Sequence, residues 1–169
     1  MCSLLNEITI YKSVINKIEY SIPLDSLEYG GGLLGLEGKP IITEFLFDKK
    51  AKTSISSYTP SQDLFEEIED PRVKGFIHSH PQGRWNLSDG DEKAMEEFLN
   101  LNPNISYSIA IIVTKHDYKY KKNNNEYIFE FDQYKKICCF ICYLNEGKLV
   151  NNPIKPNIIK ENYQELLKI

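Results

Sequence analysis

The chain has 169 residues, of which 41% are hydrophobic and 26% are charged, and its formal net charge at pH 7 is −4. This length suits one globular domain rather than two, and the negative charge gives no general attraction to nucleic acid or to an anionic membrane. No apolar run approaches the ~20 residues of a membrane-spanning helix, and the N-terminus lacks the basic and apolar regions of a signal peptide. We therefore expect a cytoplasmic protein without a nucleic-acid or membrane partner.

The first part of the chain predicts a strand, a helix and two more strands. Alternating isoleucines in residues 8–10 predict a short strand, and apolar side chains at helical spacing in residues 14–18 predict a helix that Pro23 interrupts. A glycine-rich turn then leads into a hydrophobic strand that ends at Gly35. Ile41–Asp48 forms the next strand.

The same glycines also match G-x-G-x-x-G, from Gly30 to Gly35, with Asp48 about 20 residues further on, which imitates a dinucleotide-binding fingerprint. Such a site needs a strand before the glycines and a helix that opens among them. A proline-broken helical stretch precedes them instead, and Gly38 and Pro40 forbid a helix of useful length. The dinucleotide site is therefore the weaker alternative.

The next segment predicts a polar return and a second helix. Lys49–Tyr58 has the composition of a loop or an edge strand. Thr59–Gln62 is a capping box with proline at the first helical position, which predicts a helix to about Glu69 that Pro71 ends. The side chains that we expect to face inward are Leu64, Phe65 and Ile68.

Two of the chain's three histidines follow at i, i+2 spacing. Val73–Ile77 has the apolar and β-branched character of a strand, and residues two apart on a strand point to the same face. His78 and His80 should therefore stand side by side. Pro81 cannot donate to a sheet ladder, so the strand should end there and continue as a polar loop.

A third helix is predicted to begin after Ser88, which has the position of an N-cap residue. Asp91 lies in its first turn and shares the inward face, so its carboxylate can turn back toward the strand end. The expected buried stripe of this helix consists of Ala94, Met95, Phe98 and Leu99.

Residues 118–122 interleave aromatic and basic side chains, a pattern typical of proteins that bind single-stranded nucleic acid. Asn123–Asn125 is better explained as the tip of a hairpin with arms Tyr118–Lys121 and Glu126–Phe131, whose acidic residues offset the lysines. We expect a solvated hairpin face, with His116 as a surface residue.

Cys139 and Cys142 form a C-x-x-C pair, which occurs in redox motifs and zinc sites. The sequence contains no second pair, and Ile137–Leu144 predicts a buried strand on which positions three apart face opposite sides. We interpret both as thiols of the core.

The remaining elements complete one domain. Asn102–Asn104 is a turn into the apolar strand Ile105–Val113, Asn145–Gly147 is a turn into the strand Lys148–Val150, and Ile158–Leu167 is a candidate closing helix. This order predicts a single α/β domain with a mixed β-sheet flanked by helices.

Two imidazoles and one carboxylate are a ligand set for catalytic zinc, which takes three protein ligands and leaves one position for water. Taken alone, a His-x-His on a strand is more often a packed or surface pair, and Ser-x-x-Asp is more often a simple capping box. Both patterns at one fixed spacing should arise by chance only about once in 10⁵ such chains. The sequence therefore predicts one zinc ion bound by His78, His80 and Asp91.

The same residues resemble a known motif. His78-x-His80-Pro81, six further residues and then Ser88-x-x-Asp91 are similar to the motif of the JAMM/MPN+ metalloprotease family, and the chain resembles its stand-alone prokaryotic JAB-domain peptidases. The resemblance implies a cytidine-deaminase-like (JAB/MPN) architecture over residues 1–169, with a core at about 8–144 and a C-terminal extension at 145–169.

In that family an upstream glutamate completes the motif, and Glu28 occupies its position. Glu37 and Glu44 are rivals, but the first lies among turn residues and the second within a predicted strand. We expect Glu28 to act as general base and then general acid, and Ser88 to donate to the developing oxyanion.

The resemblance also implies the substrate and partners. These are a ubiquitin-like or sulfur-carrier-like protein, cut at the amide bond after its C-terminal glycine, and conjugation enzymes of the activating and conjugating (E1/E2-like) classes, including those of bacterial antiphage systems. Two alternatives remain open: a scaffold that binds a ubiquitin-like protein without cutting it, and a metal-dependent hydrolase of small molecules.

Overall fold

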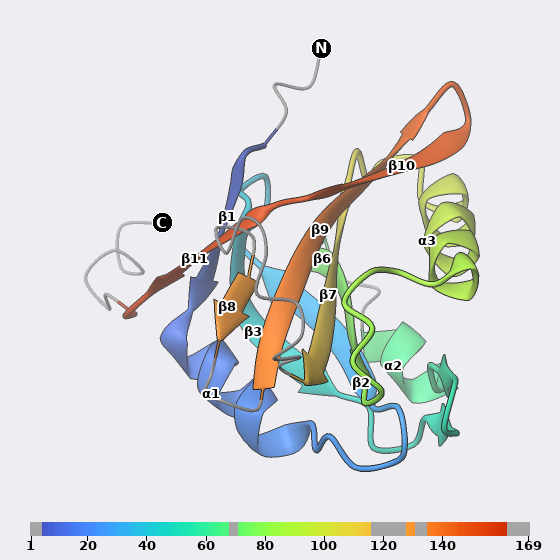
Figure 1. The fold of residues 1–169 in the computed structure, drawn as a ribbon. Helices are drawn as coiled ribbons and strands as arrows, with labels where there is room; N and C mark the ends of the chain where they lie inside the picture. Colours follow the sequence, from blue (N-terminus) through green and yellow to red (C-terminus); the bar gives the residue numbers. More distant parts are fainter. Residues whose placement is uncertain (1–4, 68–70, 116–127, 131–134, 162–169) are drawn as a thin grey trace.

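The computed structural model describes residues 5–67, 71–115, 128–130 and 135–161, and Figure 1 shows how these are arranged. The strands are β1 (Glu7–Tyr11), β2 (Gly30–Gly35), β3 (Ile41–Phe47), β4 (Lys52–Thr53), β5 (Tyr58–Thr59), β6 (Val73–His80), β7 (Ser108–Lys115), β8 (Ile128–Glu130), β9 (Lys135–Asn145), β10 (Lys148–Pro153) and β11 (Lys155–Ile159). The helices are α1 (Lys12–Ser21), α2 (Gln62–Glu67) and α3 (Asp89–Leu101). No helix in these ranges is long and apolar enough to cross a membrane.

Within the described residues, nine strands form one mixed sheet in the order β10-β9-β7-β6-β2-β3-β1-β11, with β8 pairing on β9. β6 and β7 run parallel in its middle, and their outer neighbours β2 and β9 are antiparallel to them. The strands at the two ends of this order, β10 and β11, are separated in the chain by Ile154 alone. The sheet therefore curls until one continuous segment serves both of its ends, visible as the orange-red band across Figure 1.

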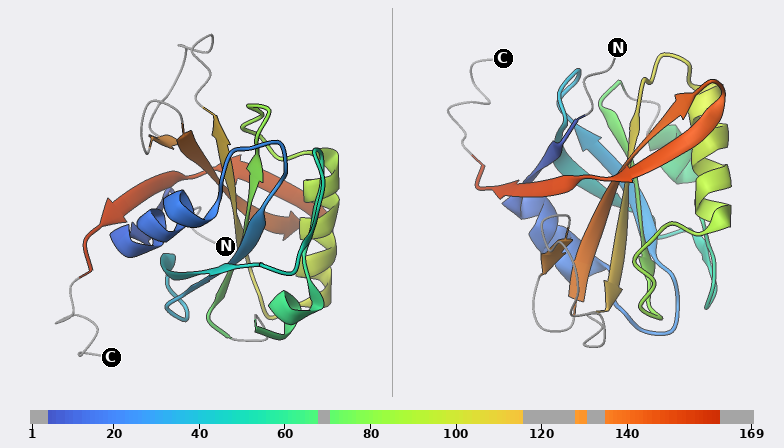
Figure 2. Two further views of the ribbon diagram at one scale, coloured as in Figure 1. Left: turned by 90° about the horizontal axis from the view of Figure 1, so that it is seen from below. Right: turned by 45° about the horizontal axis from the view of Figure 1, so that its top comes forward.

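Alternation along β7 and β9 builds one hydrophobic core on each face of the sheet. Odd-numbered residues of both strands pack with the buried side of α1, and even-numbered residues pack with Met95 and Leu99 of α3. Figure 2 shows the two helices on opposite sides of the strands. Burial on both faces explains why β7 and β9 have continuous apolar sequences.

The cysteines of β9 divide between these two cores, as their spacing predicted. Cys139 belongs to the core under α1 and Cys142 to the core under α3, and both are free thiols. Burial raises the pKa of Cys142 to about 12. Such a thiol stays protonated at neutral pH, which fits a role in packing rather than in redox chemistry.

The glycine-rich stretch is strand β2 along its whole length and not the turn that we expected. A Cβ at Gly31 would lie 1.9 Å from the Leu46 carbonyl oxygen, and one at Gly30 would lie 2.4 Å from that of Ile77. Glycine therefore lets β2 lie close to β3 and β6. No helix opens within Gly30–Gly35, so this segment lacks the geometry of a dinucleotide-binding fingerprint.

Helix α2 begins later than predicted. The Ser61 hydroxyl accepts a hydrogen bond from the Leu64 amide at 3.2 Å, so Ser61 and not Thr59 caps the helix. Leu64 is buried as expected, but Phe65 is 44% exposed because it borders a recess instead of the core. Ile68 lies outside the described residues.

The predicted C-terminal helix is wrong at its start, because Ile158 and Ile159 lie in β11. β11 pairs in parallel with β1 along its full length, and this long-range pairing outweighs the local helical spacing. The central strand begins at Ser108 and not at Ile105. Of the predicted hairpin only β8 is described, and His116 lies outside the described residues.

Candidate metal centre

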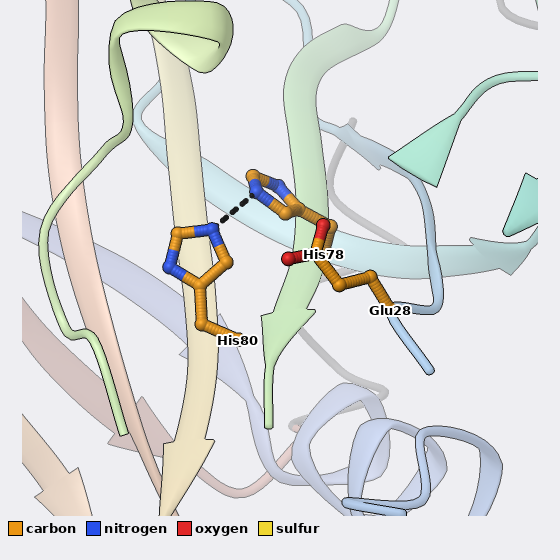
Figure 3. Close-up of side chains that lie close together, drawn as sticks. All are labelled: Glu28, His78 and His80. Atoms are coloured by element: carbon orange, nitrogen blue, oxygen red, sulfur yellow. Dashed lines mark hydrogen bonds between the residues drawn. The ribbon is translucent and has the colours of Figure 1, made fainter. Parts of the chain in front are cut away.

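The end of β6 presents both histidines on the face that α3 covers. Pro81 follows the last residue of β6, as predicted. His78 and His80 are 9% and 6% exposed, and their Nε2 atoms lie 3.0 Å apart. Figure 3 shows a nitrogen of each ring directed toward the other ring and the Glu28 carboxylate turned toward the same pair.

Helix α3 directs Asp91 toward this pair. The Ser88 hydroxyl accepts from the Asp91 amide at 3.2 Å, and Asp91 Oδ2 accepts from the Ser88 amide at 2.7 Å. Asp91 Oδ1 lies 3.1 Å from His78 Nε2, and Oδ2 lies 3.3 Å from His80 Nε2. The capping box is therefore present as predicted, and it also fixes the carboxylate beside the histidines.

Glu28 approaches from the neighbouring strand. β2 runs antiparallel to β6 with Gly30 opposite His78, so the residues before β2 lie beside the end of β6. Ser79 points away from the histidines, where its hydroxyl accepts from the Tyr29 amide at 2.9 Å and its amide donates to the Tyr29 carbonyl at 2.7 Å. These two hydrogen bonds, with one from the Glu28 amide to the β4–β5 loop at 3.0 Å, hold the glutamate in place.

The ligand atoms of Glu28, His78 and His80 all lie within 4.8 Å of one another, so this group can hold a metal ion. Ligands about 2.1 Å from a tetrahedral ion are separated by about 3.4 Å. The separations between the histidine nitrogens and between each nitrogen and Asp91 run from 3.0 to 3.3 Å, which is close to that requirement. Two carboxylates thus approach the same imidazole pair, one able to complete the coordination and the other able to act on a bound molecule.

The outer nitrogen of His80 supports this arrangement. His80 Nδ1 lies 3.2 Å from the Arg84 carbonyl oxygen. A carbonyl only accepts, so Nδ1 carries a proton, which leaves Nε2 as the nitrogen of His80 that can bind a metal. Metal-ligating histidines commonly have their other nitrogen held in this way.

The two carboxylates differ in their pKa values. Burial would raise the pKa of Asp91, but its hydrogen bonds with His78 and His80, the charge of His78 and the Ser88 amide outweigh burial and hold this pKa well below its usual range. Burial raises the pKa of Glu28, and the two histidines oppose this only in part. Asp91 is therefore the more persistent anion, which suits a ligand, whereas Glu28 accepts a proton more readily.

Two residues that the sequence analysis did not single out as part of the site support His78. The Tyr58 ring stacks on the His78 ring, with centroids 6.1 Å apart and 9° between the planes. Its hydroxyl donates to Asp48 Oδ2 at 3.2 Å, and Asp48 also accepts from the amide and hydroxyl of Ser61. No motif could reveal this support, because these segments meet only in the fold. The position of Ser79, by contrast, can be predicted from the sequence, because the residue between two same-face histidines on a strand must point to the other face.

A cleft of about 300 Å³ opens at the centre, and its lining includes Glu28, His80, Ser88 and Asp91. A second recess of about 120 Å³ shares Tyr58, Asp91 and Ala94 with this cleft. Its further walls are largely apolar and include Phe65, Phe76, Met95 and Phe98. Ala94, which we expected to be buried, is exposed where the two recesses meet. The candidate metal centre, the polar cleft and the apolar recess therefore adjoin one another.

The rival glutamates lie elsewhere. Glu37 is exposed in the turn after β2, and Glu44 lies within β3. Of the three candidates, Glu28 is the one that belongs to the described group around the histidines.

No protein-family model matches the chain, and no curated protein matches it. The fold is similar to solved structures, among them the solution structure of protein DSY2949 from Desulfitobacterium hafniense, with 14% identity and a TM-score of 0.54 over 93% of this chain and 96% of that chain. At this identity the likeness concerns the fold alone. Sheet and comparison together define a single-domain α/β protein with a mixed sheet, as the sequence predicted.

Proposed function

We propose that the protein is a zinc-dependent metallopeptidase or isopeptidase of the JAMM/MPN+ type, with the cytidine-deaminase-like architecture of that family. The proposal is carried by the convergence of His78, His80, Asp91 and Glu28 from three separate segments. Two imidazoles and a carboxylate at these separations suit the three protein ligands of catalytic zinc. A second carboxylate beside them supplies the proton-transfer group that amide hydrolysis needs.

Each residue has a defined part in the proposed reaction. When bound by His78, His80 and Asp91, zinc would supply a Lewis acid that polarises the amide carbonyl and makes water nucleophilic at neutral pH. Glu28 takes the proton from the attacking water and returns it to the leaving amine. The Ser88 hydroxyl accepts from the Asp91 amide, so its own proton is available for the oxyanion, a contact worth ~3 kcal/mol in comparable sites.

The proposed substrate is a ubiquitin-like or sulfur-carrier-like protein cut after its C-terminal glycine. A glycine tail carries no side chains, so its backbone can approach a metal at the floor of the cleft. The adjoining apolar recess favours a chain with an apolar side chain near the cut bond over a small polar molecule. We place this activity in the cytoplasm beside conjugation enzymes of the E1/E2-like classes, including antiphage systems.

The test is cleavage of ubiquitin, and of a bacterial sulfur carrier, fused through the C-terminal glycine to a reporter protein. We expect cleavage after the glycine, loss of cleavage with 1,10-phenanthroline and recovery with added zinc. Glu28→Gln should lower kcat by about 10²–10⁴-fold and leave zinc bound. Glu44→Gln is the matched control and should behave as wild type.

Two outcomes would redirect the proposal. Saturable binding of a fusion without cleavage by the zinc-loaded protein would favour the non-catalytic scaffold. Loss of zinc in Glu28→Gln would make Glu28 a ligand instead of a proton-transfer group.

A further inference from the structure

A recess of about 430 Å³ lies at the opposite end of β6 from the histidines. The turn after β2, the start of β6 and the loop before β7 bound it, and they contribute Glu37, Lys74 and Asn104–Tyr107. Along β6, the rise of ~3.3 Å per residue puts Lys74 ~20 Å from His80. The recess shares no lining residue with the cleft at the metal centre.

Lys74 is the residue that points to a ligand. It is only 7% exposed, yet among the described residues its ammonium group makes neither a hydrogen bond nor a direct ion pair. Burial lowers its pKa, and the charge of Glu37 offsets this only in part. A buried ammonium without a direct partner costs folding free energy, and a bound carboxylate would remove that cost.

The strand around Lys74 is firmly held. A Cβ at Gly35 would lie 3.0 Å from Lys74 Cγ, so the absence of a side chain there makes room for the aliphatic stem. The buried Ser108 hydroxyl donates to the Lys74 carbonyl at 3.5 Å. The ammonium is therefore carried by a packed stem on a central strand, which favours a defined binding geometry over a mobile surface charge.

Glu37 lines the same recess with the opposite charge. It is exposed and acts on Lys74 through space, without a direct ion pair. A simple anion near Lys74 would be repelled by Glu37, and a simple cation near Glu37 would be repelled by Lys74. A molecule that carries both charges satisfies both residues.

The rest of the lining indicates what such a molecule carries besides its charges. Apolar walls come from Pro71, Val73 and Ile105, and polar groups come from the neighbouring loop. The volume of about 430 Å³ falls in the range of ~300–1,000 Å³ that small-molecule sites occupy.

We propose that this recess is a second binding site, independent of the metal centre, for a free α-amino acid with an apolar side chain. Its carboxylate pairs with Lys74, its ammonium group faces Glu37, and its side chain packs on the apolar walls. The site does not depend on the hydrolytic activity proposed above.

The test is an NMR titration of the ¹⁵N-labelled full chain with L-leucine at constant ionic strength. Acetate and isopentylamine, which carry one charge each, are the control ligands. We expect saturating shifts of the Asn104–Tyr107 amides with L-leucine. Each control ligand should bind at least about 10-fold more weakly than L-leucine. Shifts that rise linearly without saturation, or equal affinity for acetate, would overturn the proposal.

Variants separate the two charges. Lys74→Met should weaken L-leucine binding by about 10-fold or more, and Glu37→Gln should weaken L-leucine binding but strengthen acetate binding. Because Glu37 is exposed, its variant should fold and give a result even if Lys74→Met does not. Glu44→Gln is the matched control and should bind L-leucine as wild type. Unchanged L-leucine affinity in Lys74→Met, or in Glu37→Gln, would contradict the assignment.

Discussion

The two ends of β6 differ in whether their buried charged side chain has a direct partner. At the histidine end, Asp91 lies within hydrogen-bonding distance of both imidazoles and of the Ser88 amide. At the other end, Lys74 is only 7% exposed but has no direct partner in the described chain. A dense group of mutually paired ligands suits a small, highly charged ion, whereas a lone charge in a roomy recess suits a ligand that brings its own counter-charge.

Of the changes proposed here, Asp91→Ala should have the largest effect on the histidine end of β6. The change removes a proposed zinc ligand and half of the capping box, so we expect zinc binding to be lost and the metal-free form to lose ~1–2 kcal/mol of unfolding free energy. Elemental analysis and urea unfolding in EDTA measure the two effects. Asp89→Ala alters an exposed acid of the same turn and should retain zinc. Full zinc occupancy in Asp91→Ala would remove this carboxylate from the ligand set.

Ser79→Ala should separate the position of Glu28 from metal binding. The Tyr29 amide would lose its acceptor, which costs ~1–3 kcal/mol for a buried donor, and Glu28 would shift. We expect kcat to fall by about 10–100-fold while zinc and KM stay close to wild type. Ser106→Ala, an exposed serine of the loop before β7, is the control. A loss of stability without a change in kcat would restrict Ser79 to a structural role.

Lowering the pH should remove the stability that the Asp91 carboxylate contributes at the histidine end. The pKa of Asp91 is lowered in the folded state, so the carboxylate contributes stability above its unfolded pKa of ~3.9, and this is lost as pH falls through the lower folded value. The midpoint temperature of thermal unfolding, measured in EDTA from pH 5 down to pH 2, should therefore fall more steeply for wild type than for Asp91→Asn. Parallel curves would show that this carboxylate is not the group that titrates.

Lys74→Met should have the smallest effect, and it should raise the free energy of unfolding, whereas Asp91→Ala lowers it. Replacing a buried, unpaired ammonium with an apolar side chain of similar length should raise the unfolding free energy by ~1 kcal/mol in the absence of a ligand. Urea unfolding beside Lys39→Met, an exposed lysine of the nearby turn, measures the difference. Destabilisation by Lys74→Met alone would mean that the charge already has a structural partner.

Local spacing was sufficient to predict which side chains meet at the histidine end of β6. Strand alternation placed His78 beside His80, and a helix cap three residues before Asp91 placed its carboxylate. The same alternation divided the β9 cysteines between two cores. These features depend on residues close together in the chain, where two periodicities leave few alternatives.

Long-range pairing explains what the sequence could not predict. Ile158 and Ile159 form a strand only because β1, about 150 residues earlier in the chain, offers them an edge. The stretch Gly30–Gly35 is a strand because it pairs with β3 and β6, which lie too close for a side chain at Gly30 or Gly31. Tyr58 stacks on His78 and donates a hydrogen bond to Asp48, and no local pattern signals either contact.

The most direct test of the metal centre is anomalous diffraction at the zinc edge from crystals of the protein soaked with zinc. We expect one peak ~2.0–2.2 Å from His78 Nε2, His80 Nε2 and an Asp91 carboxylate oxygen, with the Glu28 carboxylate nearby but not bonded to the ion. Crystals without a peak at the end of β6, or imidazoles that turn away from Asp91, would rule out a zinc site at these residues.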